Sequence, residues 1–238
     1  MHRLGPQCKL VAALAFVVLV VLTPAHRVWA FAGFATLLAG VALTARIPLP
    51  LIGRRMLVET PFVLFALAMP FLTPGDRIEV LGLPLSVAGL WGAWNVLAKA
   101  TLGVVTSILL AATTDLRMLL LGLERLRMPA LLVQIMTFMV RYSDVVTDEL
   151  HRMRIARAAR GFVARDLRAL PVLARSAGAL FIRSYERGER VHLAMLSRGY
   201  TGQLPQVTDI SAPASQWATA LALPALAAVI TTAARTSG

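Results

Sequence analysis

The sequence is poor in several residue types, and each shortage excludes a class of protein or site. Its single cysteine, Cys8, excludes an intrachain disulfide and a cysteine-based metal site. Only 15% of the 238 residues are charged, against about 25% in ordinary soluble domains. Lysine occurs only at Lys9 and Lys99, and neither lies in a glycine-rich loop. A P-loop nucleotide site is therefore excluded.

Motifs for chemistry are also lacking. There is no HExxH segment, no nucleophile elbow and no EF-hand loop. The four histidines (His2, His26, His151 and His192) are scattered, so none forms a ligand pair at helical spacing. Aromatic residues make up 7% of the chain and do not alternate with basic residues, which argues against nucleic-acid binding. We predict no enzyme activity, no catalytic residue, no cofactor and no metal site in this chain.

What the sequence has in excess is apolar residues. They make up 58% of the chain, and the mean hydropathy is +0.71, so much of the surface must face lipid. Residues 10–22 follow Arg3 and Lys9 and are similar to a secretory signal, but because more apolar segments follow we expect a first, short membrane helix. The predicted spans are 10–22, 28–45, 56–72, 87–112 and 216–232, with an extramembrane hairpin at 73–86.

Two ionisable residues fall inside these predicted spans. Glu59 lies near the start of the third span, and Lys99 lies within the fourth. An intramembrane lysine is a functional candidate by default. We favour the simpler interpretation, in which Lys99 snorkels or faces a neighbouring helix.

The pattern changes between the fourth and fifth spans, where apolar and charged residues alternate. It predicts amphipathic helices at 115–127, 129–160 and 172–198, followed by a loop at 201–213. On the second of these helices, Asp148 and Arg152 stand four residues apart and predict a surface ion pair. The apolar part of that helix is too short to cross a membrane. The fold class is thus an all-α membrane protein with about five transmembrane helices and long cytoplasmic helices between spans four and five.

The basic residues indicate the orientation in the membrane. The net charge is +12, and 12 of the 24 basic residues cluster within residues 141–198, between the fourth and fifth spans: Arg141, Arg152, Arg154, Arg157, Arg160, Arg165, Arg168, Arg175, Arg183, Arg187, Arg190 and Arg198. Arginines mark cytoplasmic segments of membrane proteins. We therefore predict three parts, with membrane helices at 1–112, a cytoplasmic region at 113–213 and a last membrane helix at 214–238. The N-terminus and the 46–55 loop, with Arg46, Arg54 and Arg55, then lie inside, and the hairpin and C-terminus outside.

A weak internal repeat marks the ends of the two long amphipathic helices. Residues 156–162 read ARAARGF, and residues 194–200 read AMLSRGY. Each glycine is a natural helix terminator, and each arginine suits the negative end of a helix dipole. That simple explanation does not account for the alanine four positions before each arginine or for the aromatic residue after each glycine. Those features suit a helix tip that inserts into a groove on another protein.

With this repeat, the order of parts resembles the transmembrane T component of energy-coupling factor (ECF) transporters. The resemblance rests on TTDLRMLLLGLERLRMPALLVQI at 113–135 and on the two triplets, and RSYERGERVHLAMLSRGYTG at 183–202 is most similar to the cobalt type, CbiQ. It implies that two triplets (Ala159, Arg160 and Gly161, then Ser197, Arg198 and Gly199) dock onto two ABC ATPase subunits. Ser197 stands where the family usually has alanine.

The resemblance further implies a non-catalytic subunit of the inner (plasma) membrane. It would transmit ATP-driven motion to a separate substrate-binding membrane protein, here for cobalt uptake. Two alternatives for transport remain, namely an ordinary ABC importer permease that binds substrate itself, and an ECF coupling subunit for nickel or a vitamin. A third is a membrane enzyme of lipid metabolism that uses Lys99 and the loop carboxylates. The sequence leaves the subunit stoichiometry open.

Overall fold

The computed structural model describes residues 4–47, 53, 55–80, 83–162, 166, 169–202 and 212–236. The chain divides into two units, one comprising Met1–Gly122 with Ile210–Gly238 and the other Leu123–Asp209. The first is called the bundle unit here, and the second the hairpin unit. Predictions for Arg54, Arg165, Arg168 and most of the 201–213 loop lie outside the described residues.

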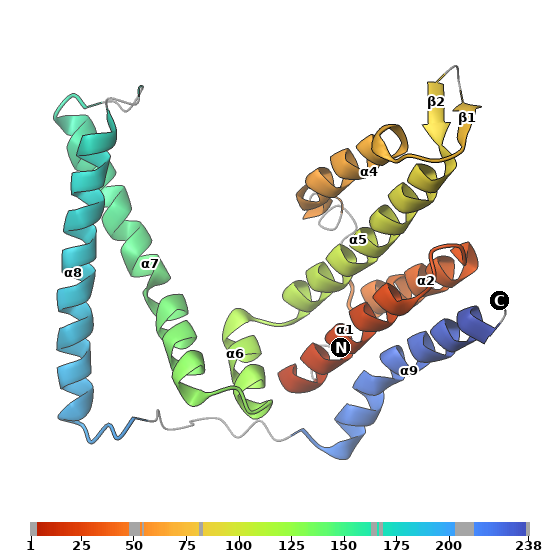
Figure 1. Cartoon of the computed structure of the whole chain (residues 1–238). Helices are drawn as coiled ribbons and strands as arrows, with labels where there is room; N and C mark the ends of the chain where they lie inside the picture. Colours follow the sequence, from red (N-terminus) through yellow and green to blue (C-terminus); the bar gives the residue numbers. More distant parts are fainter. Residues whose placement is uncertain are drawn as a thin grey trace. The chain divides into compact units, whose positions relative to one another are not determined.

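The bundle unit contains all five apolar segments of the sequence, and each forms a helix (Figure 1). Its elements in chain order are α1 (Pro6–Leu22), α2 (Val28–Thr44), η1 (Met56–Glu59), α4 (Thr60–Leu72), β1 (Arg77–Val80), β2 (Leu83–Ser86), α5 (Val87–Thr113) and α9 (Ala214–Thr236). The strands pair antiparallel with Arg77 opposite Ser86, which confirms the predicted hairpin. Ser86 then begins α5, because its hydroxyl accepts a hydrogen bond from the Gly89 N–H. A shorter helix, α6 (Leu116–Arg125), follows α5.

The core of the bundle unit lies where α1, α2, α5 and α9 pack together. Phe16 of α1 and Phe34 of α2 are fully buried, with ring centroids 5.7 Å apart in an edge-to-face arrangement. Leu102 and Leu109 of α5 and Ala227 of α9 complete this cluster. Aromatic pairs of this geometry contribute about 0.5–1.5 kcal/mol beyond their burial. The cluster fixes the relative positions of four helices that are far apart in the sequence.

Two glycines allow helices of this unit to approach closely. A methyl group at Gly89 of α5 would lie 2.7 Å from the carbonyl oxygen of Met69 on α4. A methyl group at Gly122 of α6 would lie 3.0 Å from the backbone nitrogen of Gln7 on α1. Because the neighbouring atoms belong to the backbone, they cannot swing away as a flexible side chain would. Both contacts depend on the missing side chain.

Basic side chains satisfy the carbonyl ends of two helices. Lys99 donates to the Val21 carbonyl at 2.8 Å and Arg235 to the Leu22 carbonyl at 2.9 Å, both at the end of α1. Lys9 donates to the Thr113 carbonyl at 2.9 Å, at the end of α5. The last carbonyls of a helix have no partner within it, and a bilayer core supplies no water for them. The interpretation that Lys99 faces a neighbouring helix is confirmed.

Among the described residues, three helices are long and apolar enough to cross a membrane: Val87–Thr113, Ala130–Ala159 and Ala214–Thr236. Shorter apolar helices cover Pro6–Leu22, Val28–Thr44 and Met56–Leu72. The chain is therefore an all-α membrane protein. A helix of 17 residues such as α1 extends about 25 Å, less than the roughly 30 Å of a hydrocarbon core. This set differs from the five predicted spans in two ways. Three of the predicted spans form the shorter helices, and the helix predicted to be cytoplasmic at 129–160 has the length and apolar first half of a span.

The hairpin unit consists mainly of two long helices, α7 (Ala130–Ala159) and α8 (Leu170–Leu196), which run antiparallel and lie closest where α7 ends and α8 begins (Figure 1). Their bounds confirm the predicted helices to within two residues. Within the described part of this pair, Val133 is the one buried residue of α7, and α8 has none. Large apolar side chains such as Phe181 and Ile182 are 72% and 59% exposed. Apolar burial therefore contributes little to the association of these two helices.

Candidate functional site

The two predicted triplets lie at the C-terminal ends of α7 and α8. Helix α7 ends at Ala159 with Arg160 as its cap residue, and α8 ends at Leu196 with Ser197 as its cap residue. All six triplet residues (Ala159, Arg160, Gly161, Ser197, Arg198 and Gly199) are exposed. Because the two helices are antiparallel, the triplets lie at opposite ends of the pair, about 40 Å apart along a helix of 27 residues.

The backbone at the first triplet has the form of a Schellman cap. Gly161 has a φ of +73°, a left-handed conformation that glycine adopts without steric cost. Its N–H bonds the Ala158 carbonyl at 2.9 Å, and the Phe162 N–H bonds the Arg157 carbonyl at 3.1 Å. The chain therefore turns sharply away immediately after Arg160.

The second triplet repeats this geometry. Gly199 has a φ of +83°, its N–H bonds the Leu196 carbonyl at 3.0 Å, and the Tyr200 N–H bonds the Met195 carbonyl at 3.1 Å. Among the described residues other than its chain neighbours, no atom lies within 4 Å of a methyl group built on Gly161 or on Gly199, so both turns have open space beside them. The sequence repeat is thus also a structural repeat, in which an exposed arginine stands at a helix tip and precedes a left-handed glycine.

The chemistry that these tips offer is that of a charged planar fork. A guanidinium is charged at all physiological pH values and can bond a carboxylate with two parallel N–H groups. In the part of the chain that the structure describes, the Arg160 and Arg198 side chains have no ion pair or hydrogen bond. The two forks are consequently available to a docking surface.

The predicted ion pair between Asp148 and Arg152 is wrong. Arg152 instead donates to the neighbouring carboxylate, with its Nη2 atom 2.9 Å from Glu149 Oε2. The other oxygen, Glu149 Oε1, accepts a hydrogen bond from Arg183 of α8. Of the two adjacent acids, Glu149 points toward α8, so it reaches cations on both helices. Glu149 lies beyond the apolar first half of α7. The hydrogen bond from Arg152, and to a smaller extent that from Arg183, holds the pKa of Glu149 below its usual range.

A second contact between the helices was not predicted from the sequence. The Tyr200 hydroxyl donates to Gln134 Oε1 at 2.7 Å, and Gln134 Nε2 donates to the Gly202 carbonyl at 2.9 Å. Since a backbone carbonyl can only accept, the second bond fixes which way the Gln134 amide faces. The sequence does contain one indication of this contact. Tyr200 carries a hydroxyl that can donate a hydrogen bond, whereas Phe162, at the matching position of the repeat, has none.

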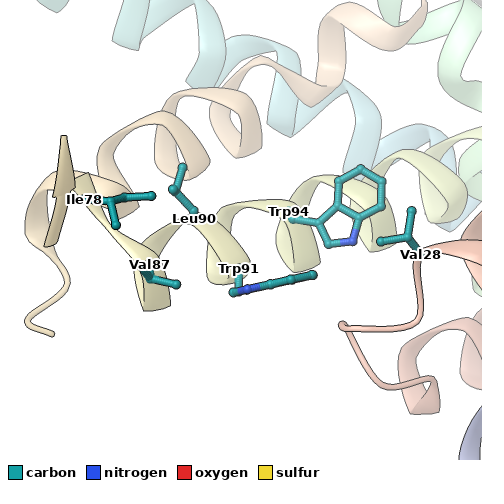
Figure 2. A pocket seen from close by; sticks show the side chains of 6 residues that line it. All are labelled: Val28, Ile78, Val87, Leu90, Trp91 and Trp94. Carbon is teal, nitrogen blue, oxygen red and sulfur yellow. The ribbon is translucent and has the colours of Figure 1, made fainter. Parts of the chain in front are cut away.

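The bundle unit contains a separate apolar pocket of about 440 Å³ (Figure 2). It is lined by Val28, Ile78, Val87, Leu90, Trp91 and Trp94. The His26 ring lies 4.6 Å from the Trp91 ring, centroid to centroid. None of the six lining side chains is ionisable, so the pocket offers no acid, base or nucleophile. Among the described residues, no three His, Cys, Asp or Glu side chains lie close enough to hold a metal ion.

Comparison with known protein families identifies the family of this chain. Residues 1–208 match the cobalt transport proteins named CbiQ. The chain belongs to the CbiQ family. This match covers both triplets and every element up to α8, so the family resemblance inferred from the repeat is confirmed.

Individual relatives of this CbiQ-family chain carry related names. A "Putative fused cobalt transport protein CbiMQ" of Methanocorpusculum labreanum is 31% identical over 147 residues, or 58% of this chain and 24% of the relative. An "Energy-coupling factor transporter transmembrane protein EcfT" of Heliobacterium modesticaldum is 29% identical over 222 residues, or 84% of this chain and 80% of the relative. An uncharacterized protein of Methanocaldococcus jannaschii is 31% identical over 115 residues, or 48% of this chain and 43% of the relative. The chain thus spans less than half the length of the two archaeal relatives.

Proposed function

We propose that this chain is the coupling subunit of an ECF-type importer and that it serves cobalt uptake. In this role it receives ATP-driven motion from two ABC ATPase subunits and transmits it to a separate substrate-binding membrane protein. The observation that carries the proposal is the repeated helix tip, in which Arg160 and Arg198 each precede a left-handed glycine. Membership of the cobalt transport family supports the role and the choice of metal.

The magnitude of the arginine contribution separates docking from simple helix capping. A guanidinium buried against a carboxylate leaves that carboxylate unpaired when it is removed, which typically costs about 2–5 kcal/mol. An arginine that only complements the helix dipole contributes about 0.3–1 kcal/mol. Docking therefore predicts at least about a 30-fold loss of ATPase affinity for each arginine, and capping predicts almost none. We assign the docking role to both triplets, with Ala159 and Ser197 as small flanks.

The membrane arrangement follows from the charge distribution. We propose that residues 113–213 are cytoplasmic between membrane helices at 1–112 and 214–238, with five spans of the inner membrane in total. Fifteen arginines in that region support the proposal. A cysteine introduced at Gly161, with Cys8 replaced, should not react with an impermeant reagent in intact cells and should react after lysis. Labelling in intact cells would refute the topology.

In this proposal the separate substrate-binding membrane protein binds the metal, and the ABC ATPase subunits hydrolyse ATP. Replacing all four histidines should leave cobalt uptake by the whole transporter largely intact. Loss of uptake from a change at His151 or His192 alone, with assembly preserved, would reveal a metal site on this chain and would favour a permease that binds substrate itself.

The direct test of the proposed role is co-purification from native membranes. A coupling subunit should retain ABC ATPase subunits and a separate small membrane protein, and cells that lack this chain should lose cobalt uptake. Retention of an ATPase without any further membrane protein, together with cobalt binding by this chain, would favour the ordinary permease. Normal uptake in its absence would refute the role.

A further inference from the structure

The two helices that carry the docking arginines are joined by polar contacts rather than by a core. Helix α8 has no buried residue among those described, and α7 has only Val133. The Glu149 side chain is nevertheless only 15% exposed, because it lies between Arg152 and Arg183. Gln134 is half-buried and uses both ends of its amide. Polar contacts thus replace the apolar packing that normally holds two helices together.

These contacts are widely separated along the pair. Gln134 and Glu149 stand about 15 residues apart on α7, which corresponds to roughly 22 Å. Their partners Tyr200 and Arg183 are separated by a similar stretch of chain, as an antiparallel register requires. Two helices joined at a single point can pivot about it. Two joints about 22 Å apart prevent that rotation.

We propose that Glu149 and Gln134 are positioning residues that lock α7 and α8 into one rigid lever, so that the Arg160 and Arg198 tips move together. This inference rests on the proposed coupling function. In the absence of the two joints, motion applied at one tip would be absorbed by a change in the angle between the helices. Neither residue needs to touch an ATPase in this role.

The two joints act differently on the two tips. The Gln134 joint reaches the segment immediately after Gly199, so it holds the Arg198 tip directly against the start of α7. Phe162 has no hydroxyl with which to make the corresponding bond at the Arg160 tip. The Glu149 joint lies between them, where the carboxylate divides its two oxygens between the two helices. The lever is thus held at one tip and along its length.

The inference predicts that assembly and transport separate. Glu149→Gln and Tyr200→Phe leave both arginine tips in place, so the transporter should retain its ATPase subunits while cobalt uptake falls by about threefold or more. The matched controls are Glu189→Gln and Tyr185→Phe, which change the same groups at exposed positions of α8. Both controls should transport normally. The reversed pair, Glu149→Arg with Arg183→Glu, should recover at least half of the uptake that Glu149→Gln loses.

A distance measurement on the intact transporter in nanodiscs tests the rigidity itself. Spin labels at Ala158 on α7 and Ala174 on α8, in a Cys8→Ser background, should give one narrow distance distribution. Glu149→Gln combined with Tyr200→Phe should broaden it, and Glu189→Gln should not. Normal uptake with an unbroadened distribution in the double variant would overturn the lever. Loss of the ATPase subunits in the double variant would also overturn the lever. The proposed coupling function is tested separately, by ATPase binding and cobalt uptake in Arg160→Ala and Arg198→Ala.

Discussion

The bundle unit and the hairpin unit are built from helices of similar length but are held together by different forces. In the bundle unit, Phe16 and Phe34 are fully buried, and close contacts between helix backbones depend on Gly89 and Gly122. In the hairpin unit, one residue of α7 and none of α8 is buried among those described, and the helices meet through Glu149 and Gln134. One unit has a packed interior, and the other has two exposed surfaces.

This difference indicates which unit is a scaffold and which is an interaction surface. Burial of apolar area contributes about 25 cal/mol per Å² and stabilises a structure without any partner. The exposed side chains of α8, including Phe181 and Tyr185, make no such contribution within this chain. The hairpin unit should therefore tolerate changes that leave folding intact and alter binding, while equivalent changes in the bundle unit should alter folding.

The largest difference between the units should come from adding one methyl group to a glycine. Gly89→Ala places its Cβ 2.7 Å from the Met69 carbonyl oxygen, and this overpacking should cost about 1–3 kcal/mol. Gly103→Ala on the same helix and Gly188→Ala on α8 meet no atom of the described residues within 4 Å, so they should stabilise their helices by up to about 1 kcal/mol. Thermal unfolding in detergent measures all three. Equal melting temperatures for Gly89→Ala and Gly103→Ala would refute the close contact between α4 and α5.

A smaller effect, also confined to the bundle unit, should follow from removing the cation of Lys99. Lys99→Met keeps the apolar stem but leaves the Val21 carbonyl without its 2.8 Å donor, which should cost about 0.5–1.5 kcal/mol. Because Lys99 is structural in this account, protein that still folds should transport cobalt at the normal rate. The measurement pairs melting temperature with uptake normalised to the amount of folded protein. Unchanged stability with abolished uptake would instead make Lys99 a functional residue.

The smallest effect should be a dependence of the hairpin unit on pH. Arg152 and Arg183 lower the pKa of Glu149 in the folded chain, so its contribution to the α7–α8 contact is fully present above the pKa of the unfolded chain. That contribution should be lost as the pH falls through the lowered, folded-state pKa. The distance distribution between labels at Ala158 and Ala174 should accordingly stay narrow at neutral pH and broaden only in strong acid. In Glu149→Gln the distribution should not change with pH.

Much of this architecture follows from periodicity and composition. The apolar segments predicted α1, α2, α4, α5 and α9 of the bundle unit, and the turn residues predicted the hairpin. The ends of α7 and α8 were predicted closely because Gly161 and Gly199 stop helices by a local conformational preference, which depends little on the rest of the fold. Local signals of this kind can be read from a sequence directly.

Contacts between elements were not predictable in the same way. Asp148 and Glu149 are adjacent acids, and spacing along one helix favoured Asp148 as the partner of Arg152. The choice of Glu149 depends on Arg183, which comes from another helix and contributes the second cation. The partner of Tyr200 likewise lies 66 residues away at Gln134. Sequence pattern also does not separate a membrane span from a surface helix at α7, since its first half is apolar enough for either environment.

The most direct test of the account is the affinity of the ABC ATPase subunits for this chain when both arginine tips are removed. The chain with Arg160→Ala and Arg198→Ala should insert, fold and melt within about 1 kcal/mol of the unaltered chain, because each side chain contributes little to its own helix. It should lose the ATPase subunits in a pull-down and lose cobalt accumulation in cells, and lysine at both positions should restore only part of each, since it keeps the charge but not the planar fork. Full retention of the ATPase with normal cobalt accumulation in the double alanine variant would show that the arginines only cap their helices, and would contradict the coupling role.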